Sequence, residues 1–268
     1  MKIKFDIDKF VKYLDKFKSD LSKLYTWNSK IDKLVENKIL TENQVSEINA
    51  LSSEQKFYEK ELLLKKIVGP KLVTAFKSKN DTFYKLCSWI VEDWGGIKTG
   101  NETAELINNF LNNEKPNFNR IASSSKVGAY MFPNKNVIYD SRVAYTLNWI
   151  ILSENAGQKY FPIPNSRNTK MTAFDLNVLI RLKNISIYKT NDIKNLDNRL
   201  YINNIDKELF INKKYAYYEL NNLVMQINKK LWKGDSEKEQ NLFYTEMLLF
   251  SIANREVFMD ITTRYGTI

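Results

Sequence analysis

Histidine is absent from the 268-residue sequence, and cysteine occurs only once, at Cys87. A single cysteine excludes an internal disulfide, a zinc knuckle and a cysteine-ligated iron–sulfur cluster. The lack of histidine excludes a Ser-His-Asp triad, a Cys-His pair and any histidine-ligated metal. Chemistry on this chain must therefore use carboxylates, Lys, Arg, Tyr, Ser or water, and we expect neither a metal nor another cofactor.

Glycine and proline are also scarce, with eight and five residues, whereas apolar residues make up 43% of the chain. This composition favours a globular and mostly helical protein. No apolar run is long enough to span a bilayer. An acidic residue, Asp6, stands where a signal peptide would have its apolar stretch. We therefore expect a cytoplasmic protein without a membrane partner.

Positive charge is in excess, because 41 Lys and Arg residues face 31 Asp and Glu residues and give a formal net charge of +10. A polyanionic partner would explain this excess, since each phosphate contact releases condensed counterions. An AT-rich coding sequence could also raise the lysine content. However, seven basic and only two acidic residues lie between positions 120 and 170. This concentration favours nucleic-acid binding over codon bias.

Hydrophobic periodicity predicts helices along the whole chain. Residues 41–44 resemble a capping box, and Gly69-Pro70 is expected to break one helix. Two strands are the one expected exception, over 185–201. The main predicted helices lie within 54–66, 72–94, 103–111, 173–182, 207–232 and 236–260. The sequence thus predicts an all-α fold in one compact unit over residues 1–268, with room for two subdomains (1–100 and 101–268) and an active-site cleft between them.

The segment from Arg120 to Ala144 carries most of the chemistry that the sequence offers. A short helix is expected over 123–132, with one of its first three serines as the N-cap. A brief extended piece over 137–139 follows. Asp140 is then expected to cap a long apolar helix that runs over 141–152.

This segment resembles the core of helix-hairpin-helix DNA glycosylases, particularly the 8-oxoguanine glycosylase branch. Members of that family carry a Gly-rich hairpin that ends in Lys and opens a helix. A connector follows, and then an apolar residue, Asp, any residue, and His or Arg begin the next helix. In this chain the hairpin matches 122–126, its lysine matches Lys126, and the aspartate and basic residue match Asp140 and Arg142. The resemblance implies an all-α helix-hairpin-helix glycosylase fold.

The match departs from the family pattern in two ways. Ala122 and Ser124 replace the hairpin glycines, so the hairpin is degenerate. Thirteen residues separate Lys126 from Asp140, fewer than is usual in the family, and this could move Lys126 away from the sugar. The missing iron–sulfur cysteines argue against the endonuclease III branch.

The chemistry of base excision fits the matched residues. Breaking an N-glycosidic bond passes through an oxocarbenium-like state, so a carboxylate such as Asp140 can stabilise the developing charge or activate water. An amine with a depressed pKa, such as Lys126, can instead attack the sugar and form a Schiff base. The resemblance implies that both residues are catalytic. The plainer alternatives are a helix N-cap for Asp140 and a phosphate contact for Lys126.

DNA contacts and a base pocket follow from the same comparison. A helix N-terminus favours anions, so the serines near 123–125 could hold a phosphate. The predicted DNA-binding residues are Arg120, Ser123, Ser124, Ser125, Arg142 and Arg167. A flipped base needs aromatic or apolar walls. The predicted base pocket consists of Trp94, Tyr139, Phe243, Met247 and Phe250, bordered by the loop over 157–167.

The resulting hypothesis is a monomeric DNA glycosylase that acts on double-stranded DNA with a flipped nucleotide and leaves an abasic site. Its substrate would be oxidised guanine in repair, or a modified base of phage DNA such as glucosylated hydroxymethylcytosine in antiviral defence. One alternative is a non-catalytic helical DNA- or RNA-binding protein that uses the same basic segment. Another is an interaction subunit of a larger complex.

Overall fold

Helices account for almost all regular structure in the computed structural model, which describes residues 3–98, 100, 103–113, 118–165 and 168–266. Within these ranges extended chain pairs only at two isolated bridges, Phe5 with Gly157 and Tyr160 with Phe210. The predicted all-α class is confirmed. The strands predicted over 185–201 are wrong, because short helices occupy that stretch and the Asp192 side chain caps one of them by accepting the Lys194 amide.

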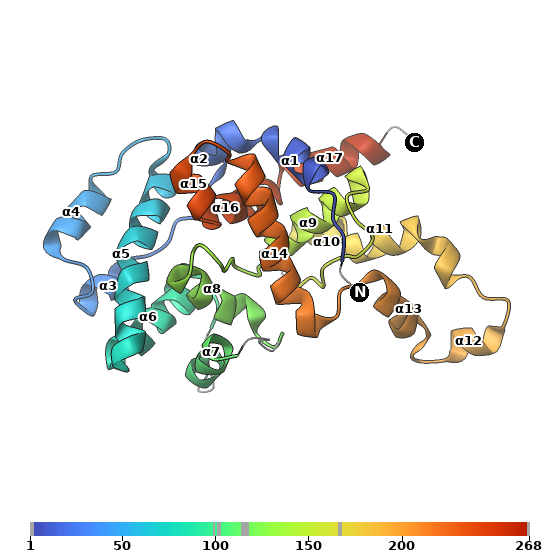
Figure 1. The fold of residues 1–268 in the computed structure, drawn as a ribbon, viewed down its shortest axis with the longest axis horizontal. Coiled ribbons are helices and arrows are strands. Elements are labelled where there is room, and N and C mark those ends of the chain that lie inside the picture. Colours follow the sequence, from blue (N-terminus) through green and yellow to red (C-terminus); the bar gives the residue numbers. More distant parts are fainter. Residues whose placement is uncertain (1–2, 99, 101–102, 114–117, 166–167, 267–268) are drawn as a thin grey trace.

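Figure 1 shows an elongated arrangement in which α4 lies near one end and α12 near the other. Three elements are not α-helices: the 3-10 turns η1 (Lys18–Asp20) and η3 (Ile185–Tyr188), and the π-helix η2 (Trp89–Trp94). The α-helices are α1 (Ile7–Asp15), α2 (Leu21–Leu24), α3 (Asp32–Glu36), α4 (Glu42–Asn49), α5 (Lys56–Ser78), α6 (Asp81–Ser88), α7 (Thr103–Leu111), α8 (Ile121–Met131), α9 (Ser141–Glu154), α10 (Thr169–Ala173), α11 (Leu176–Lys183), α12 (Ile193–Asp197), α13 (Tyr201–Leu209), α14 (Lys213–Leu231), α15 (Ser236–Gln240), α16 (Phe243–Ile252) and α17 (Glu256–Tyr265).

The break predicted at Gly69-Pro70 is wrong, because α5 continues through it to Ser78. Proline removes one backbone hydrogen bond from a helix. Here the flanking Val68 and Leu72 are fully buried, and their packing holds the helix on both sides of the proline. The glycine serves close packing instead, since a Cβ at this position would lie 2.8 Å from the carbonyl oxygen of Tyr130 on α8.

Other boundaries also differ from the pattern-based ones. The helix predicted over 72–94 is divided at Lys79, which has a left-handed φ of 50°. The last predicted helix, over 236–260, is three helices, α15, α16 and α17. The capping box at Thr41 is confirmed, because its side chain accepts the Gln44 amide while the Gln44 side chain accepts the Thr41 amide.

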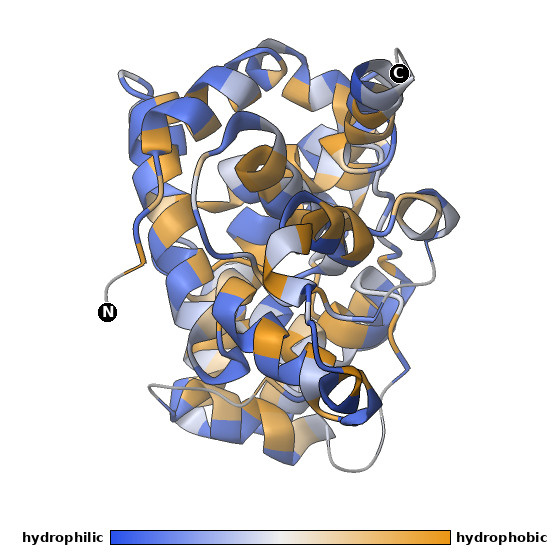
Figure 2. Ribbon diagram, turned by 90° about the vertical axis from the view of Figure 1, so that its right-hand side faces the viewer, coloured by the Kyte–Doolittle hydropathy of each residue, from blue (hydrophilic) through white to orange (hydrophobic). Residues whose placement is uncertain are grey.

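Two hydrophobic cores organise the molecule. The smaller core collects buried side chains of α3 to α8 and η2, such as Leu64, Leu72 and Trp89. The larger core is formed mainly by buried side chains of five helices, which are α1, α9, α11, α14 and α16. Figure 2 shows the corresponding alternation of hydrophilic and hydrophobic residues along the helices. The two cores do not divide at residue 100, because Phe10 and Leu14 of α1 pack with the second half of the chain.

The segment that resembles the glycosylase core is a helix, an extended connector and a second helix. The first helix, α8, begins at Ile121, so the hairpin expected over 122–126 is wrong, and those residues form helical turns. Its N-cap is Arg120, in a left-handed conformation with φ of 51°, rather than one of the serines. Asp140 caps α9, as predicted, and its side chain accepts the Arg142 amide. No described helix is long and apolar enough to cross a membrane.

Candidate active site

A cavity of about 720 Å³ lies where the two cores meet. Trp94 and Ile138 reach it from the smaller core, whereas Phe250 packs on the larger one and Trp27 on both. The lining residues are Trp27, Trp94, Gly95, Gly96, Ile97, Lys98, Ala122, Lys126, Ile138, Asp140, Ser141, Arg142, Pro164, Asn165, Asn168, Glu246 and Phe250. The site therefore combines aromatic side chains with two carboxyl groups, of Asp140 and Glu246, and two amines, of Lys98 and Lys126.

Asp140 is the N-cap residue of α9, and this role fixes the position of its side chain. Its Oδ1 accepts the Arg142 amide at 2.8 Å, and its Oδ2 lies 4.0 Å from the Lys126 Nζ. The helix N-terminus and the ammonium group both stabilise negative charge on this carboxylate. The relative solvent exposure of the Asp140 side chain is 23%, so a ligand in the cavity can reach it. One oxygen is thus fixed by the backbone while the other faces the buried Lys126 amine.

Lys126 lies in the second turn of α8 and is buried to 4% exposure. Its Nζ donates a hydrogen bond to the carbonyl oxygen of Ala122 at 2.8 Å and lies 5.8 Å from the centre of the Trp94 ring. Burial lowers the pKa of this amine, and the nearby Asp140 and Glu246 carboxyl groups act in the opposite direction. A lowered amine pKa is the property that a nucleophilic lysine needs.

Three aromatic side chains, Trp27, Trp94 and Phe250, form part of the cavity wall. The Trp27 Nε1 donates to the carbonyl oxygen of Trp94 at 2.9 Å, and the two rings are 6.3 Å apart. The Arg142 guanidinium lies 4.4 Å from the centre of the Phe250 ring and 5.6 Å from that of Trp27, and these two rings are 5.8 Å apart. A flat group that entered the cavity would meet ring faces and a planar cation, which suits a nucleobase.

Glu246 of α16 provides a second carboxyl group in the cavity lining. It is buried to 4% exposure, and its Oε2 accepts the Ile138 amide at 3.4 Å. Burial raises the pKa of this carboxyl group to about 7, with the negative charges of Glu61 and Asp140 adding to the effect and Lys65 opposing it. A carboxyl group with this pKa can exchange a proton near neutral pH.

A buried polar network supports the Trp94 side of the cavity. Glu61 of α5 is fully buried and accepts hydrogen bonds from Trp94 Nε1 at 2.8 Å and from the Tyr130 hydroxyl at 3.1 Å. The Lys65 Nζ lies 3.3 Å from Glu61 Oε1 and 4.4 Å from the centre of the Tyr130 ring. These contacts fix the orientation of the Trp94 indole, because both carboxylate oxygens of Glu61 are engaged.

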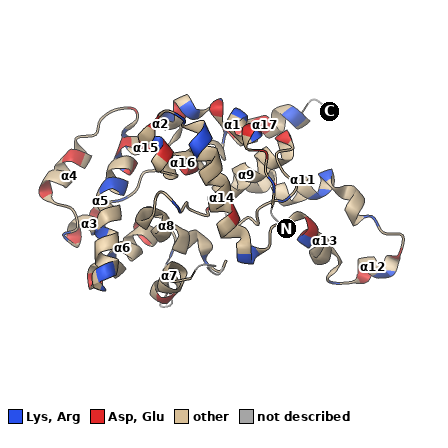
Figure 3. Cartoon of the chain, in the orientation of Figure 1, with Lys and Arg blue, Asp and Glu red and all other residues tan. Residues whose placement is uncertain are grey.

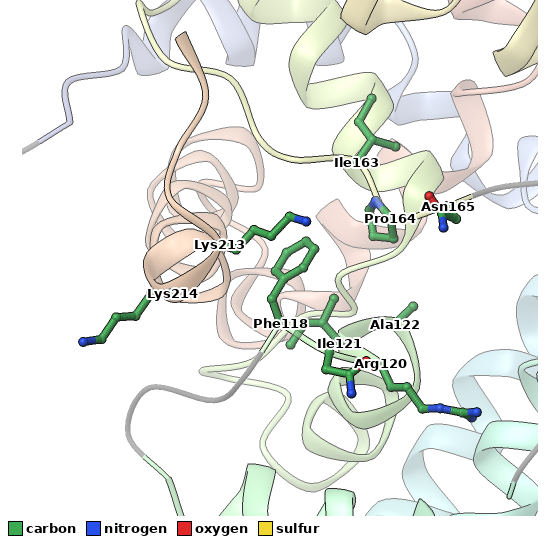
Figure 4. Close-up of a pocket in the computed structure, with 10 residues that line it drawn as sticks. Phe118, Arg120, Ile121, Ala122, Ile163, Pro164, Asn165, Lys213 and Lys214 are labelled. Atoms are coloured by element: carbon green, nitrogen blue, oxygen red, sulfur yellow. The ribbon is translucent and has the colours of Figure 1, made fainter. Parts of the chain in front are cut away.

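A second cavity, of about 790 Å³, adjoins the first and shares Ala122, Pro164 and Asn165 with it. Arg120, Lys213 and Lys214 line this cavity, at the N-terminal ends of α8 and α14. Figure 4 shows the Lys213 side chain beside Phe118, with its Nζ 5.6 Å from the ring centre, while Lys214 points away. Figure 3 shows that other Lys and Arg residues are spread over most helices. This basic cavity is therefore a site where the phosphate groups of a nucleic-acid backbone could lie next to the candidate active site.

Several predicted site residues meet in the first cavity. Asp140 and Lys126 face one another there, so the short connector does not separate them, and Arg142, Trp94 and Phe250 join them. Arg120 lies at the neighbouring basic cavity.

Other predicted site residues lie elsewhere, contrary to the prediction. Ser125 is fully buried and its hydroxyl accepts the Tyr139 amide, while Ser123 and Ser124 are buried within α8, so their side chains face the protein and not a phosphate. Tyr139 is buried against Phe118 and donates to the carbonyl oxygen of Pro162. Phe243 lines a separate cavity beside α5. Met247 is buried in the larger core and is not part of the cavity lining. Arg167 lies outside the described residues.

Several residues of the site lie outside the predicted set, among them Trp27, Asn165, Asn168 and Glu246. Trp27 comes from a coil segment after α2 with no periodicity to mark it. Asn165 and Asn168 lie at the end of the predicted border loop and just beyond it. Glu246 had a visible signal, because it is the only charged residue in the apolar sequence of α16. A lone charged residue in such a sequence is informative, because glutamate is almost never fully buried unless it is paired.

Comparison with protein-family models, with curated proteins and with solved structures finds no match to this chain.

Proposed function

We propose that this protein is a DNA glycosylase that flips out a modified or damaged base and cleaves its N-glycosidic bond. The observation that carries the proposal is the pairing of Asp140 with Lys126, 4.0 Å apart, in a cavity with aromatic walls beside a basic cavity. The chain would be a divergent relative of the 8-oxoguanine glycosylase branch. The site supports this relationship, whereas α8 lacks the hairpin of that family.

The roles follow from the geometry. Asp140 stabilises positive charge on the sugar as the bond to the base breaks, and it orients the water that attacks. Lys126, with its lowered pKa and its place beside that carboxylate, is positioned to attack the sugar in the alternative route through a Schiff base. Arg120 and Lys213 would hold the DNA backbone, and Trp94, Trp27 and Phe250 would enclose the extruded base.

The substrate is proposed to be oxidised guanine or a modified cytosine of phage DNA, such as its glucosylated hydroxymethyl form. Ligand cavities span about 300–1,000 Å³. The cavity of about 720 Å³ is in the upper half of that range and suits a base that carries a bulky substituent.

The test is an excision assay on duplex oligonucleotides that carry one modified base each. Treatment with alkali converts abasic sites into strand breaks. We expect breaks at one of the modified bases with the wild type and none with Asp140→Asn. Borohydride should trap a covalent complex that is lost in Lys126→Ala if the lysine is the nucleophile, and no complex if water is.

The basic cavity favours one second candidate, a non-catalytic DNA- or RNA-binding protein. In that case the wild type and Asp140→Asn would bind nucleic acid equally well and neither would release a base from any substrate.

A further inference from the structure

Glu246 lies on a different helix from Asp140 and Lys126, yet lines the same cavity. The two lysines of this interior each have a closer carboxylate: Lys65 lies 3.3 Å from Glu61, and Lys126 lies 4.0 Å from Asp140. Among the described residues, Glu246 forms no ion pair within 4.0 Å. Within the described chain, the Glu246 carboxyl group therefore has no ammonium group at ion-pair distance to hold it in the charged form.

The groups around Glu246 determine how tightly its carboxyl group holds a proton. Its Oε2 accepts the Ile138 amide, which leaves Oε1 as the oxygen that carries hydrogen in the acid form. The titratable groups that interact with Glu246 come from the elements packed around it: Glu61 and Lys65 of α5, Tyr25 after α2, Lys126 and Tyr130 of α8, Asp140 at the start of α9, and Tyr217 of α14. Two of these carboxylates disfavour a further negative charge at Glu246, and burial does so more strongly.

We propose that Glu246 is the general acid that protonates the departing base. The inference rests on the proposed glycosylase function and adds a requirement on the substrate, which must present a ring nitrogen or carbonyl oxygen to the Glu246 side of the cavity. Bases that leave poorly as anions gain most from such a proton.

The step balances as a hydrolysis. The O–H bond of Glu246 breaks and its proton goes to the acceptor atom of the base. The electron pair of the glycosidic bond leaves with the base, which departs neutral, and Asp140 faces the sugar cation. Water then bonds to the sugar carbon and gives up a proton through Asp140 to solvent. The Glu246 carboxylate regains its proton from solvent.

This assignment separates the pH dependence of the two candidate catalytic groups. An acid that must be protonated makes the rate fall as the pH rises, whereas a lysine that must be unprotonated makes the rate rise. Glu246 should therefore produce the falling limb of the profile, with an inflection near pH 7. Asp140, which must be ionised, would also produce a rising limb, so only a rising limb that disappears in Lys126→Ala belongs to Lys126.

The experiment measures single-turnover excision against pH on duplexes that carry 8-oxoguanine, hydroxymethylcytosine or glucosylated hydroxymethylcytosine, using whichever the wild type cuts. Above the inflection the wild-type rate should fall about tenfold per pH unit. Glu246→Gln should lose that limb and be slower at low pH by about a hundredfold or more. Glu237→Gln on α15 is the matched control, because Glu237 is half-exposed at a different cavity, and it should keep the wild-type profile.

A carbon NMR titration of the wild type with labelled glutamate gives a readout that does not need a folded variant. One carboxyl group should titrate at the same pH as the kinetic inflection. A falling limb that persists in Glu246→Gln, or no carboxyl titration near that inflection, overturns the general-acid role and leaves the glycosylase function standing. Absence of excision by the wild type on every substrate overturns the glycosylase function and the general-acid role with it.

Discussion

Asp140 has two roles that a pair of substitutions can separate. Its Oδ1 caps α9 by accepting the Arg142 amide, and asparagine caps a helix as well as aspartate does. Asp140→Asn should therefore change the free energy of unfolding by only a few tenths of a kcal/mol, whereas Asp140→Ala should lower it by about 1 kcal/mol. Denaturant unfolding of the two variants measures this difference.

Excision should follow a different order. Both substitutions remove the negative charge, so both should slow base release by about a hundredfold to a thousandfold. If only Asp140→Ala lost activity, in proportion to its lost stability, Asp140 would be a cap and nothing more.

Glu246 should also make stability depend on pH. Its pKa is raised in the folded state from 4.5 to about 7, so the folded protein holds the proton more tightly than the unfolded chain does. Wild-type stability from this group is fully present below pH 4.5 and is lost as the pH rises to about 7. Gln cannot ionise, so Glu246→Gln should gain roughly 3 kcal/mol of unfolding free energy relative to the wild type across that window.

Chemical denaturation at a series of pH values checks the linkage. Glu237→Gln should not reproduce it, because hydrogen bonds from Tyr244 and Lys66 lower the pKa of the Glu237 carboxyl group and outweigh the opposite effect of burial. A constant difference between Glu246→Gln and the wild type over the whole range would contradict the raised pKa.

At the scale of elements, η2 and α8 fit together closely beside the site. A Cβ on Gly95 would lie 2.8 Å from the Lys126 Cε and 2.6 Å from the carbonyl oxygen of Val91. Gly95→Ala should destabilise the protein by about 1–3 kcal/mol. It should also displace the Lys126 amine, so the yield of any borohydride-trapped complex should fall.

Gly100→Ala is the control, because no atom lies within 4 Å of its added Cβ and its φ is not in the left-handed region. It should unfold like the wild type. Equal stability of the two alanine variants would mean that η2 and α8 can separate without cost.

The sequence predicts elements of this molecule better than it predicts their ends. The cap at Asp140 and the capping box at Thr41 depend on neighbours within three residues, and both are confirmed. The breaks at Pro70 and within 72–94 depend on tertiary packing and on one left-handed lysine, which no local pattern indicates. The hairpin expected over 122–126 fails for a related reason, since Arg120 adopts the left-handed cap and the serines continue the helix.

The candidate site was predictable in part for the same physical reasons. Asp140, Lys126 and Arg142 lie close in the chain and were matched to one motif. Trp27 and Glu246 reach the cavity through long-range contacts between the two cores, so neither could be placed without the fold. Phe243 and Met247 lie on the same helix as Glu246 and Phe250, but Phe243 lines a different cavity and Met247 is buried in the larger core.

At the scale of the whole molecule, the net charge of +10 should strengthen DNA binding mainly through a few residues at the basic cavity. Each lost phosphate contact should reduce the slope of log affinity against log salt by about 1. Lys213→Ala and Arg120→Ala should each do so in fluorescence-anisotropy titrations with duplex DNA, and the double variant should lose about 2. Lys194→Ala on the exposed α12 is the control and should keep the wild-type slope. Equal slopes for the wild type and all four variants would mean that the DNA backbone does not lie at this cavity.

The most direct test of the central claim is base release from duplex DNA by the wild type and by Asp140→Asn at equal folded concentration. We expect alkali-sensitive sites at one modified base with the wild type, unchanged DNA binding in the variant, and loss of those sites. Identical behaviour of the two proteins on every modified substrate would contradict the assignment of the Asp140 cavity as a glycosylase active site.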